Sequence, residues 1–260
     1  MTIIASTVDP NVRISNSAGD YHQYTRPDQF VTQFDWFDNY PQDHLTLVGE
    51  YATVQPNNGD INAGTDWSLP RSPTPFWIGS VAEAVFSIGI ERNSDKIIGA
   101  SYAPLLQNMD GYQWTPDLIS YNADTSSTTL STSYHVIKLL ASTRTTSVLP
   151  IVSDTDFNST EAGLAFWVAG YNDPRSTYIV KFAIYNTTDG ADVPFALEFP
   201  GAATTARITY LTAPSPYSAN VFGAEEVVQS TGLDVVADEE GKFVFQLPQW
   251  SVAVLETQEE

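Results

Sequence analysis

The alternation of apolar and polar positions is clearest around residues 45–52. Leu45, Leu47 and Val48 form an apolar run that is long enough for a buried strand and too short for a helix. The run ends in Gly49 and Glu50. A carboxylate at the end of an apolar strand is costly to bury unless it has partners or a task there. Glu50 is therefore a candidate site residue, and the plainer alternative is that it ends an edge strand in water.

The first half of the chain alternates strand-like and helix-like patterns. Thr25, Pro27 and Asp28 are typical of a helix start, with Thr25 as the cap, and phenylalanines follow at helical spacing. In the second predicted helix, at 78–92, we expect the charged Glu83 and Glu91 to lie at solvated or terminal positions. Strands alternating with helices favour parallel pairing in an α/β layer or barrel. The predicted elements are strand 3–7, short segment 18–24, a helix bearing Phe30, Phe34 and Phe37, strand 45–48, helix 78–92 and strand 96–102.

Polar side chains gather where these strands end. Such folds place their active sites at the carboxyl ends of the strands. The long loop 53–77 between the second strand and its helix carries Trp67 and Trp77, and a loop of this length is typical of a lid or binding loop. The side chains at the strand ends are His22, Tyr24, Glu50, Gln107 and Asn108.

The second half has a different pattern, with short strands separated by Gly, Asn, Asp and Pro. This spacing predicts an antiparallel β-sandwich. A Ser/Thr-rich stretch at 122–132 resembles a linker, and 133–140 reads as a short helix or strand. We therefore divide the chain into a partial barrel at 1–124 and a sandwich at 125–260. The predicted sandwich strands are 164–169, 178–185, 195–199, 206–211, 243–247 and 251–255.

Composition narrows the class of partner. The 260 residues are 42% hydrophobic and 16% charged, which is typical of a globular chain, and the net charge is −20. This charge argues against nucleic acid and anionic membranes, and it is compatible with a neutral polysaccharide. There is no cysteine, and His22, His44 and His135 lack ligand spacing, so we expect no metal and no cofactor.

Targeting signals are sparse. The first residues lack the basic start and long apolar core of a signal peptide, and no apolar run approaches the ~20 residues of a membrane span. The triplets at Asn158 and Asn186 are glycosylation acceptors and lean toward a secreted origin. The sequence does not predict an oligomeric state.

A series of short motifs occurs in a fixed order along almost the whole chain. The motifs are Asp20-Tyr-His22-Gln-Tyr24, Phe37-Asp-Asn-Tyr40, Val48-Gly-Glu50-Tyr-Ala52, Ala82-Glu-Ala84, Glu91-Arg-Asn93, Ala100-Ser-Tyr-Ala-Pro104, Trp114-Thr-Pro-Asp117 and the closing Ser251-Val-Ala-Val-Leu255. Taken in order, they resemble the C-terminal part of glycoside hydrolase family 51, the α-L-arabinofuranosidases of fungal and plant type. The resemblance implies a (β/α)8 TIM barrel followed by a β-sandwich, in an extracellular enzyme that releases arabinose from arabinoxylan and arabinan with retention.

The resemblance also implies roles for individual residues. Glu50 matches the catalytic nucleophile, and Tyr24 matches the residue that hydrogen-bonds and orients it. His22, Asn108 and Trp114 match positions at the sugar-binding site.

One part of the family pattern is missing. The family's acid/base is a Glu in an Asn-Glu pair, and this sequence contains no such pair and begins near the fifth barrel strand. A retaining glycosidase needs two carboxyl groups about 5–5.5 Å apart. Asp20 is nearest to the expected site, and its place before His22 suggests a structural role. We therefore expect this chain to be inactive alone, and the alternative is a non-catalytic carbohydrate-binding or structural β-sandwich fragment.

Overall fold

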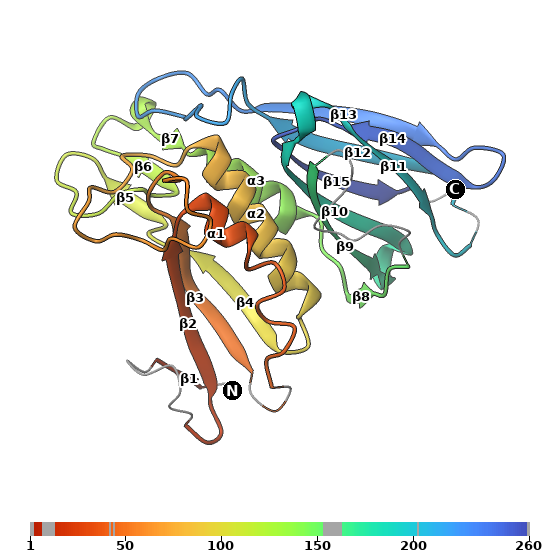
Figure 1. Ribbon diagram of the computed structural model, residues 1–260, viewed down its shortest axis with the longest axis horizontal. Helices are drawn as coiled ribbons and strands as arrows, with labels where there is room; N and C mark the ends of the chain where they lie inside the picture. Colours follow the sequence, from red (N-terminus) through yellow and green to blue (C-terminus); the bar gives the residue numbers. More distant parts are fainter. Residues whose placement is uncertain are drawn as a thin grey trace.

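A computed structural model describes residues 3–6, 14–41, 43, 45–152, 163–201 and 203–258. Its N-terminal part is a four-stranded parallel sheet in the order β1-β2-β3-β4 (Figure 1). The carboxyl ends of β2 and β3 therefore lie at the same edge. The strands are β1 (Ile4–Ala5), β2 (Ala18–Thr25), β3 (Thr46–Thr53) and β4 (Ile97–Tyr102). Within the described residues, the strand predicted at 3–7 is only the two residues of β1. Two residues named in the sequence analysis, His44 and Asn158, lie outside the described residues.

The first helix, α1 (Pro27–Val31), is shorter than the phenylalanine spacing predicted. Beyond Val31 the chain continues in turns, for example from Tyr40 N to Phe37 O. Its N-cap is Arg26, so the assignment of Thr25 as the cap was wrong, and the Thr25 hydroxyl bonds Gln29 instead. Phe30, Phe34 and Phe37 are all buried, because a chain of successive turns can direct them to the same side.

Helix α2 (Trp77–Arg92) confirms the second predicted helix and lies at the centre of the molecule. Its first two N–H groups, of Trp77 and Ile78, donate to the carbonyls of Ser218 and Pro216, far away in the sequence. Nearly every position of α2 is buried, because the parallel sheet covers one side and an antiparallel sheet covers another. The solvated position predicted for Glu83 is therefore wrong, since this residue is only 1% exposed.

A small three-stranded sheet follows β4. It contains β5 (Leu106–Asn108), β6 (Ile119–Tyr121) and β7 (Thr129–Leu130). The segment 132–142 is helix α3 (Thr132–Ser142), which decides between the helix and the strand expected there. The Ser131 side chain caps α3 by accepting a hydrogen bond from Tyr134 N at 3.2 Å.

The C-terminal part is antiparallel. A six-stranded sheet has the order β13-β12-β15-β10-β9-β8, and a separate two-stranded sheet pairs β11 with β14. The six predicted strands are confirmed, with boundaries shifted by a few residues. Strands β8 and β13 were not predicted, and β13 is exposed over most of its length and lacks an alternating pattern. The bounds are β8 (Ser147–Leu149), β9 (Gly163–Asn172), β10 (Thr177–Thr187), β11 (Val193–Glu198), β12 (Thr205–Thr212), β13 (Gln229–Val236), β14 (Lys242–Leu247) and β15 (Ser251–Thr257).

The central strands of the six-stranded sheet, β10 and β15, are covered on both faces. One face packs on β11 and β14, where Phe182 meets Phe195 and Phe245. The other packs on α2, which lies with α1 and α3 between the parallel and antiparallel sheets (Figure 1). Trp77 Nε1 donates to Trp250 O at 2.6 Å across this junction. The two parts therefore share a hydrophobic core. Within the described ranges, no helix has the length and apolarity needed to cross a bilayer.

Candidate active site

The carboxyl ends of β2 and β3 bring Tyr24 and Glu50 together. The strands are parallel neighbours, and Tyr24 and Glu50 lie within two register positions of each other. The Tyr24 hydroxyl donates to Glu50 Oε2 at 2.5 Å, as the sequence predicted. Burial, and then this bond to Glu50, raise the pKa of Tyr24. The phenol therefore remains a donor throughout the neutral pH range.

His22 is the second neighbour of Glu50. Its Nδ1 lies 3.4 Å from Glu50 Oε2, and its Nε2 lies 3.0 Å from Asp20 Oδ2. The imidazole thus bridges two carboxyl groups. Gly49 makes room for this arrangement, because a Cβ there would lie 2.2 Å from Asp20 Oδ1.

The site is open to solvent. The side chains of Glu50 and His22 are 41% and 40% exposed. No group of three or more acidic or histidine side chains in the described part of the chain is arranged to hold a metal.

Aromatic rings form one wall next to Tyr24. The Trp114 ring lies 5.3 Å from the Tyr24 ring, and Trp67 lies 6.5 Å from Tyr24 and 6.0 Å from Trp114. The guanidinium of Arg71 stacks over Trp114 at 4.0 Å. Trp114 was expected at the sugar-binding site, whereas Trp67 was not. The Trp67 side chain is 59% exposed. The signal that pointed to Trp67 was its place in the long loop 53–77.

Asn108 is in a different setting. It ends β5, and its side-chain oxygen accepts a hydrogen bond from Asp110 N at 3.0 Å within a local turn. None of the interactions of Asn108 with other described residues joins it to Glu50. Its substrate-binding role thus has less support than that of His22.

Two further carboxyl groups in the described part of the chain, those of Asp20 and Asp66, have hydrogen-bond partners of their own. Asp20 is held by His22. Asp66 accepts bonds from the Ser68 hydroxyl and N–H, which lower its pKa and make it a poor general acid.

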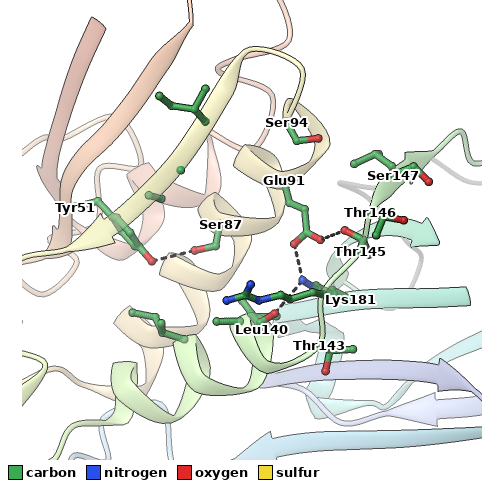
Figure 2. Close-up of a pocket in the computed structure, with 17 residues that line it drawn as sticks. Tyr51, Ser87, Glu91, Ser94, Leu140, Thr143, Thr145, Thr146, Ser147 and Lys181 are labelled. Carbon is green, nitrogen blue, oxygen red and sulfur yellow. Dashed lines mark hydrogen bonds and ion pairs between the residues drawn. The ribbon is translucent and has the colours of Figure 1, made fainter. Parts of the chain in front are cut away.

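A cavity of about 620 Å³ lies elsewhere, between α2, α3, β4 and residues 143–148. Figure 2 shows Lys181 and Glu91 facing each other there, with Nζ and Oε2 2.7 Å apart. Glu50 is not among the residues lining this cavity, so the cavity is separate from the candidate active site.

Comparisons with known proteins identify the family of this chain. Residues 49–251 match the model of the alpha-L-arabinofuranosidase C-terminal domain. Alpha-L-arabinofuranosidase A of Aspergillus niger is 36% identical over an alignment of 265 residues. The alignment covers 98% of this chain and 37% of that enzyme, and the Aspergillus kawachii enzyme gives the same values. The arabinose-bound structure of the MgGH51 α-L-arabinofuranosidase has a TM-score of 0.81 at 26% identity and covers 100% of this chain and 40% of that one.

The chain spans little more than a third of the length of the curated relatives that it matches. The matched family model nevertheless covers most of the chain, including Glu50. This protein belongs to the alpha-L-arabinofuranosidase C-terminal domain family and corresponds to the C-terminal portion of the family 51 enzymes.

Proposed function

We propose that this chain supplies the nucleophile side of a retaining α-L-arabinofuranosidase site. The observation that supports it is the 2.5 Å hydrogen bond from Tyr24 to Glu50 at adjacent strand ends. A fixed donor leaves the second carboxylate oxygen of Glu50 available for attack and limits its rotation. Such a pre-positioned carboxylate is what covalent glycoside hydrolysis requires.

In the proposed reaction, Glu50 attacks the anomeric carbon of a terminal arabinofuranosyl unit and the leaving oxygen departs. Water then attacks the glycosyl-enzyme and releases arabinose with retention. Tyr24 orients Glu50 in both steps. His22 approaches the same carboxylate oxygen of Glu50 as Tyr24 and has the polarity to bind a sugar hydroxyl.

The acid/base comes from outside the described site. We propose that further strands complete a (β/α)8 barrel around this sheet and carry that acid. The sheet order supports this, because β1 and β4 are the outer strands of an open parallel sheet. None of the interactions described for Glu50 brings it a general acid, and such proton donation is worth roughly 10²–10⁴-fold in rate. We therefore propose that the chain has negligible turnover without that part.

The proposed substrate is an arabinose-bearing polysaccharide such as arabinoxylan or arabinan, and the parent enzyme is extracellular. Trp67 and Trp114 offer flat apolar surfaces beside Glu50. The net charge of −20 is compatible with a neutral polymer.

The rival function is a non-catalytic carbohydrate-binding fragment. Such a module would present a row of exposed aromatic rings on one face of its sheet. The large exposed side chains on β13 and β14 are the aliphatic Leu233, Val236 and Val244. No observation on the described strands favours the binding module over the enzyme portion.

The test uses a substrate that does not need acid assistance. A 2,4-dinitrophenolate departs without protonation, so 2,4-dinitrophenyl α-L-arabinofuranoside isolates the attack by Glu50 from the missing acid. Without a general base, the second step is slow and the glycosyl-enzyme accumulates. We expect intact mass spectrometry to show one added pentosyl group on the chain. Mass spectrometry after proteolytic digestion should then locate that group on the peptide that contains Glu50.

The matched controls are Glu50→Gln, which removes the nucleophile, and Asp66→Asn, which alters a nearby carboxyl group outside the mechanism. The adduct should disappear in the first variant and persist in the second. Failure of the wild-type chain to form an adduct, or an adduct that survives Glu50→Gln, would contradict the proposal.

A further inference from the structure

Glu83 is a buried acid that the proposed reaction does not use. It lies in the middle of α2 and is 1% exposed. No cation pairs with it in the described part of the chain, whereas Glu91 on the same helix pairs with Lys181. Burying an unpaired carboxylate is costly, so its surroundings must either stabilise the anion or keep the acid neutral.

One oxygen of Glu83 fixes the end of strand β3. Glu83 Oε1 accepts hydrogen bonds from Thr53 N at 2.8 Å and Thr53 Oγ1 at 2.7 Å. Strand β4 ends at Tyr102, opposite Tyr51, so the N–H of Thr53 has no strand partner on that side. Thr53 lies three residues beyond Glu50. Glu83 thus holds the strand segment that carries the proposed nucleophile.

The other oxygen begins a chain of hydroxyl contacts. Glu83 Oε2 lies 2.5 Å from Ser133 Oγ on α3, and Ser133 Oγ lies 2.9 Å from Ser80 Oγ. Ser80 Oγ lies 2.8 Å from Thr132 Oγ1, which lies 3.1 Å from the carbonyl oxygen of Pro75. These side chains are all buried.

Counting protons along this chain determines its direction. The Pro75 carbonyl has no proton, so Thr132 donates to it, and each hydroxyl has only one proton to give. Ser80 must then donate to Thr132, and Ser133 must donate to Ser80. The contact between Ser133 and Glu83 is left without a proton unless Glu83 supplies it.

An ionised Glu83 breaks this pattern. Ser133 would donate to the carboxylate and Ser80 to Ser133, and the single Thr132 proton could then serve either Ser80 at 2.8 Å or Pro75 O at 3.1 Å, which leaves one of these two contacts without a proton. Ser80 has a second acceptor, Phe76 O, but this contact is long at 3.4 Å. Four contacts are satisfied by four protons only when Glu83 is protonated.

We propose that Glu83 is a positioning residue for Glu50 that is protonated in the folded chain at mildly acidic pH, accepting from Thr53 at the end of β3 and donating to Ser133 on α3. The positioning role rests on the proposed function of Glu50, whereas the protonation rests on the hydroxyl chain alone. Tyr51 on β3 and Tyr102 on β4 are the titratable groups facing Glu83, and each brings its own proton. Burial also raises the pKa of Glu83 to about 7.

The Glu83→Gln variant tests the protonation. A glutamine amide accepts from Thr53 with its oxygen and donates to Ser133 with its nitrogen, as the neutral acid does. Because the folded pKa exceeds that of the unfolded chain, Glu83 stabilises wild type below about pH 4.5, and this contribution is lost as pH rises through about 7. We expect equal stability of variant and wild type at about pH 5. At about pH 8.5, the folding constant of the variant should exceed that of wild type on the order of 100-fold.

Infrared spectroscopy provides a second readout. Wild type at about pH 5 should show a carboxylic-acid C=O band that is absent from Glu83→Gln. A variant that is destabilised equally at both pH values, or that does not fold, would overturn the proposal, because it would show that the site needs an anion. A missing band would overturn it as well.

The positioning role of Glu83 is tested by nuclear magnetic resonance of the Glu50 carboxyl group, without any activity assay. The ¹³C signal of the Glu50 carboxyl, assigned by its loss in Glu50→Gln, should be unchanged in Glu83→Gln and shifted in Glu83→Ala. An unchanged signal in a folded Glu83→Ala variant would overturn the positioning role. If that variant does not fold, Thr53→Val replaces it, since it removes the Oγ1 bond to Glu83. None of these readouts depends on Glu50 being a nucleophile, so they can fail separately from the proposed function.

Discussion

At the scale of single residues, the candidate site depends on how one carboxylate is held. One oxygen of Glu50, Oε2, contacts both the phenol of Tyr24 and the imidazole of His22, and both residues come from β2. Tyr24 also packs its ring against Trp114, so its hydroxyl and its ring have separable roles. Removing only the hydroxyl therefore tests orientation of the nucleophile without disturbing the aromatic wall.

Tyr24→Phe should slow the proposed formation of the Glu50 adduct. A hydrogen bond to a charged group is worth about 1.5–3 kcal/mol, which corresponds to roughly 10–100-fold in rate when it acts in the transition state. Time-resolved intact mass spectrometry measures the rate. Tyr21→Phe is the matched control, because the Tyr21 hydroxyl bonds Gln23. Equal rates in wild type and Tyr24→Phe would argue against an orienting role.

At the scale of elements, α2 organises the molecule through close packing on both sides. Gly89 lets the backbone of Phe34 approach, because a Cβ at Gly89 would lie 2.3 Å from the Phe34 carbonyl oxygen. On another side, Glu91 reaches Lys181 on β10. The helix thus fixes the distance between the parallel and antiparallel sheets.

Gly89→Ala should destabilise the protein, although Gly→Ala inside a helix usually stabilises it by about 1 kcal/mol. The clash is with a backbone oxygen that cannot rotate away, so we expect a loss of about 1–3 kcal/mol. Urea unfolding followed by circular dichroism measures it. Gly111→Ala, where a Cβ meets nothing within 4 Å, should have little effect. A stabilised Gly89→Ala variant would show that α2 and the Phe34 turn are not tightly packed.

Lys181→Met should cost about 3 kcal/mol of unfolding free energy, because it leaves Glu91 without its cation while the Lys181 side chain is only 5% exposed. Adding Glu91→Gln should recover part of this loss, since the amide still accepts from Thr145. Chemical denaturation of the single and double variants measures the coupling. Lys242→Met, which breaks an exposed pair with Glu240, should leave the unfolding midpoint unchanged. A neutral Lys181→Met variant would contradict the buried pair's role.

At the scale of the whole molecule, the two parts are unequal. The C-terminal part has a core of its own between the six-stranded and two-stranded sheets. The core of the N-terminal part includes Phe166, Ile179 and Val252 from the antiparallel sheet. The N-terminal part therefore depends on the C-terminal part for its packing. The boundary near residues 124–125 remains a proposal.

Limited proteolysis should therefore leave a resistant C-terminal fragment that begins near residues 122–133, since its own core persists after the N-terminal part is digested. Released from α2, this fragment exposes an apolar sheet face and should self-associate. Mass spectrometry and size-exclusion chromatography follow both effects. A resistant N-terminal fragment would contradict this unequal dependence.

Much of the local structure was determined by the sequence. The apolar run before Glu50 and the stripe of α2 produced a strand and a helix where predicted, because periodicity follows from which face is buried. The order of polar strand ends predicted that Tyr24 and Glu50 lie near one edge, and the resemblance to family 51 implied the hydrogen bond between them. Parallel strands bring their carboxyl ends to one edge, so sequence order alone implies that proximity.

The tertiary structure decided what local pattern does not encode. Glu83 read as a solvated helix position, yet it is buried because β3 and α3 close over it from distant parts of the chain. Strand β13 lacks an alternating pattern, so only its pairing with β12 reveals it. Trp67 joins Trp114 because the long loop folds back over the strand ends. Each of these depends on partners remote in sequence, and pairing between distant segments is the information that a one-dimensional pattern omits.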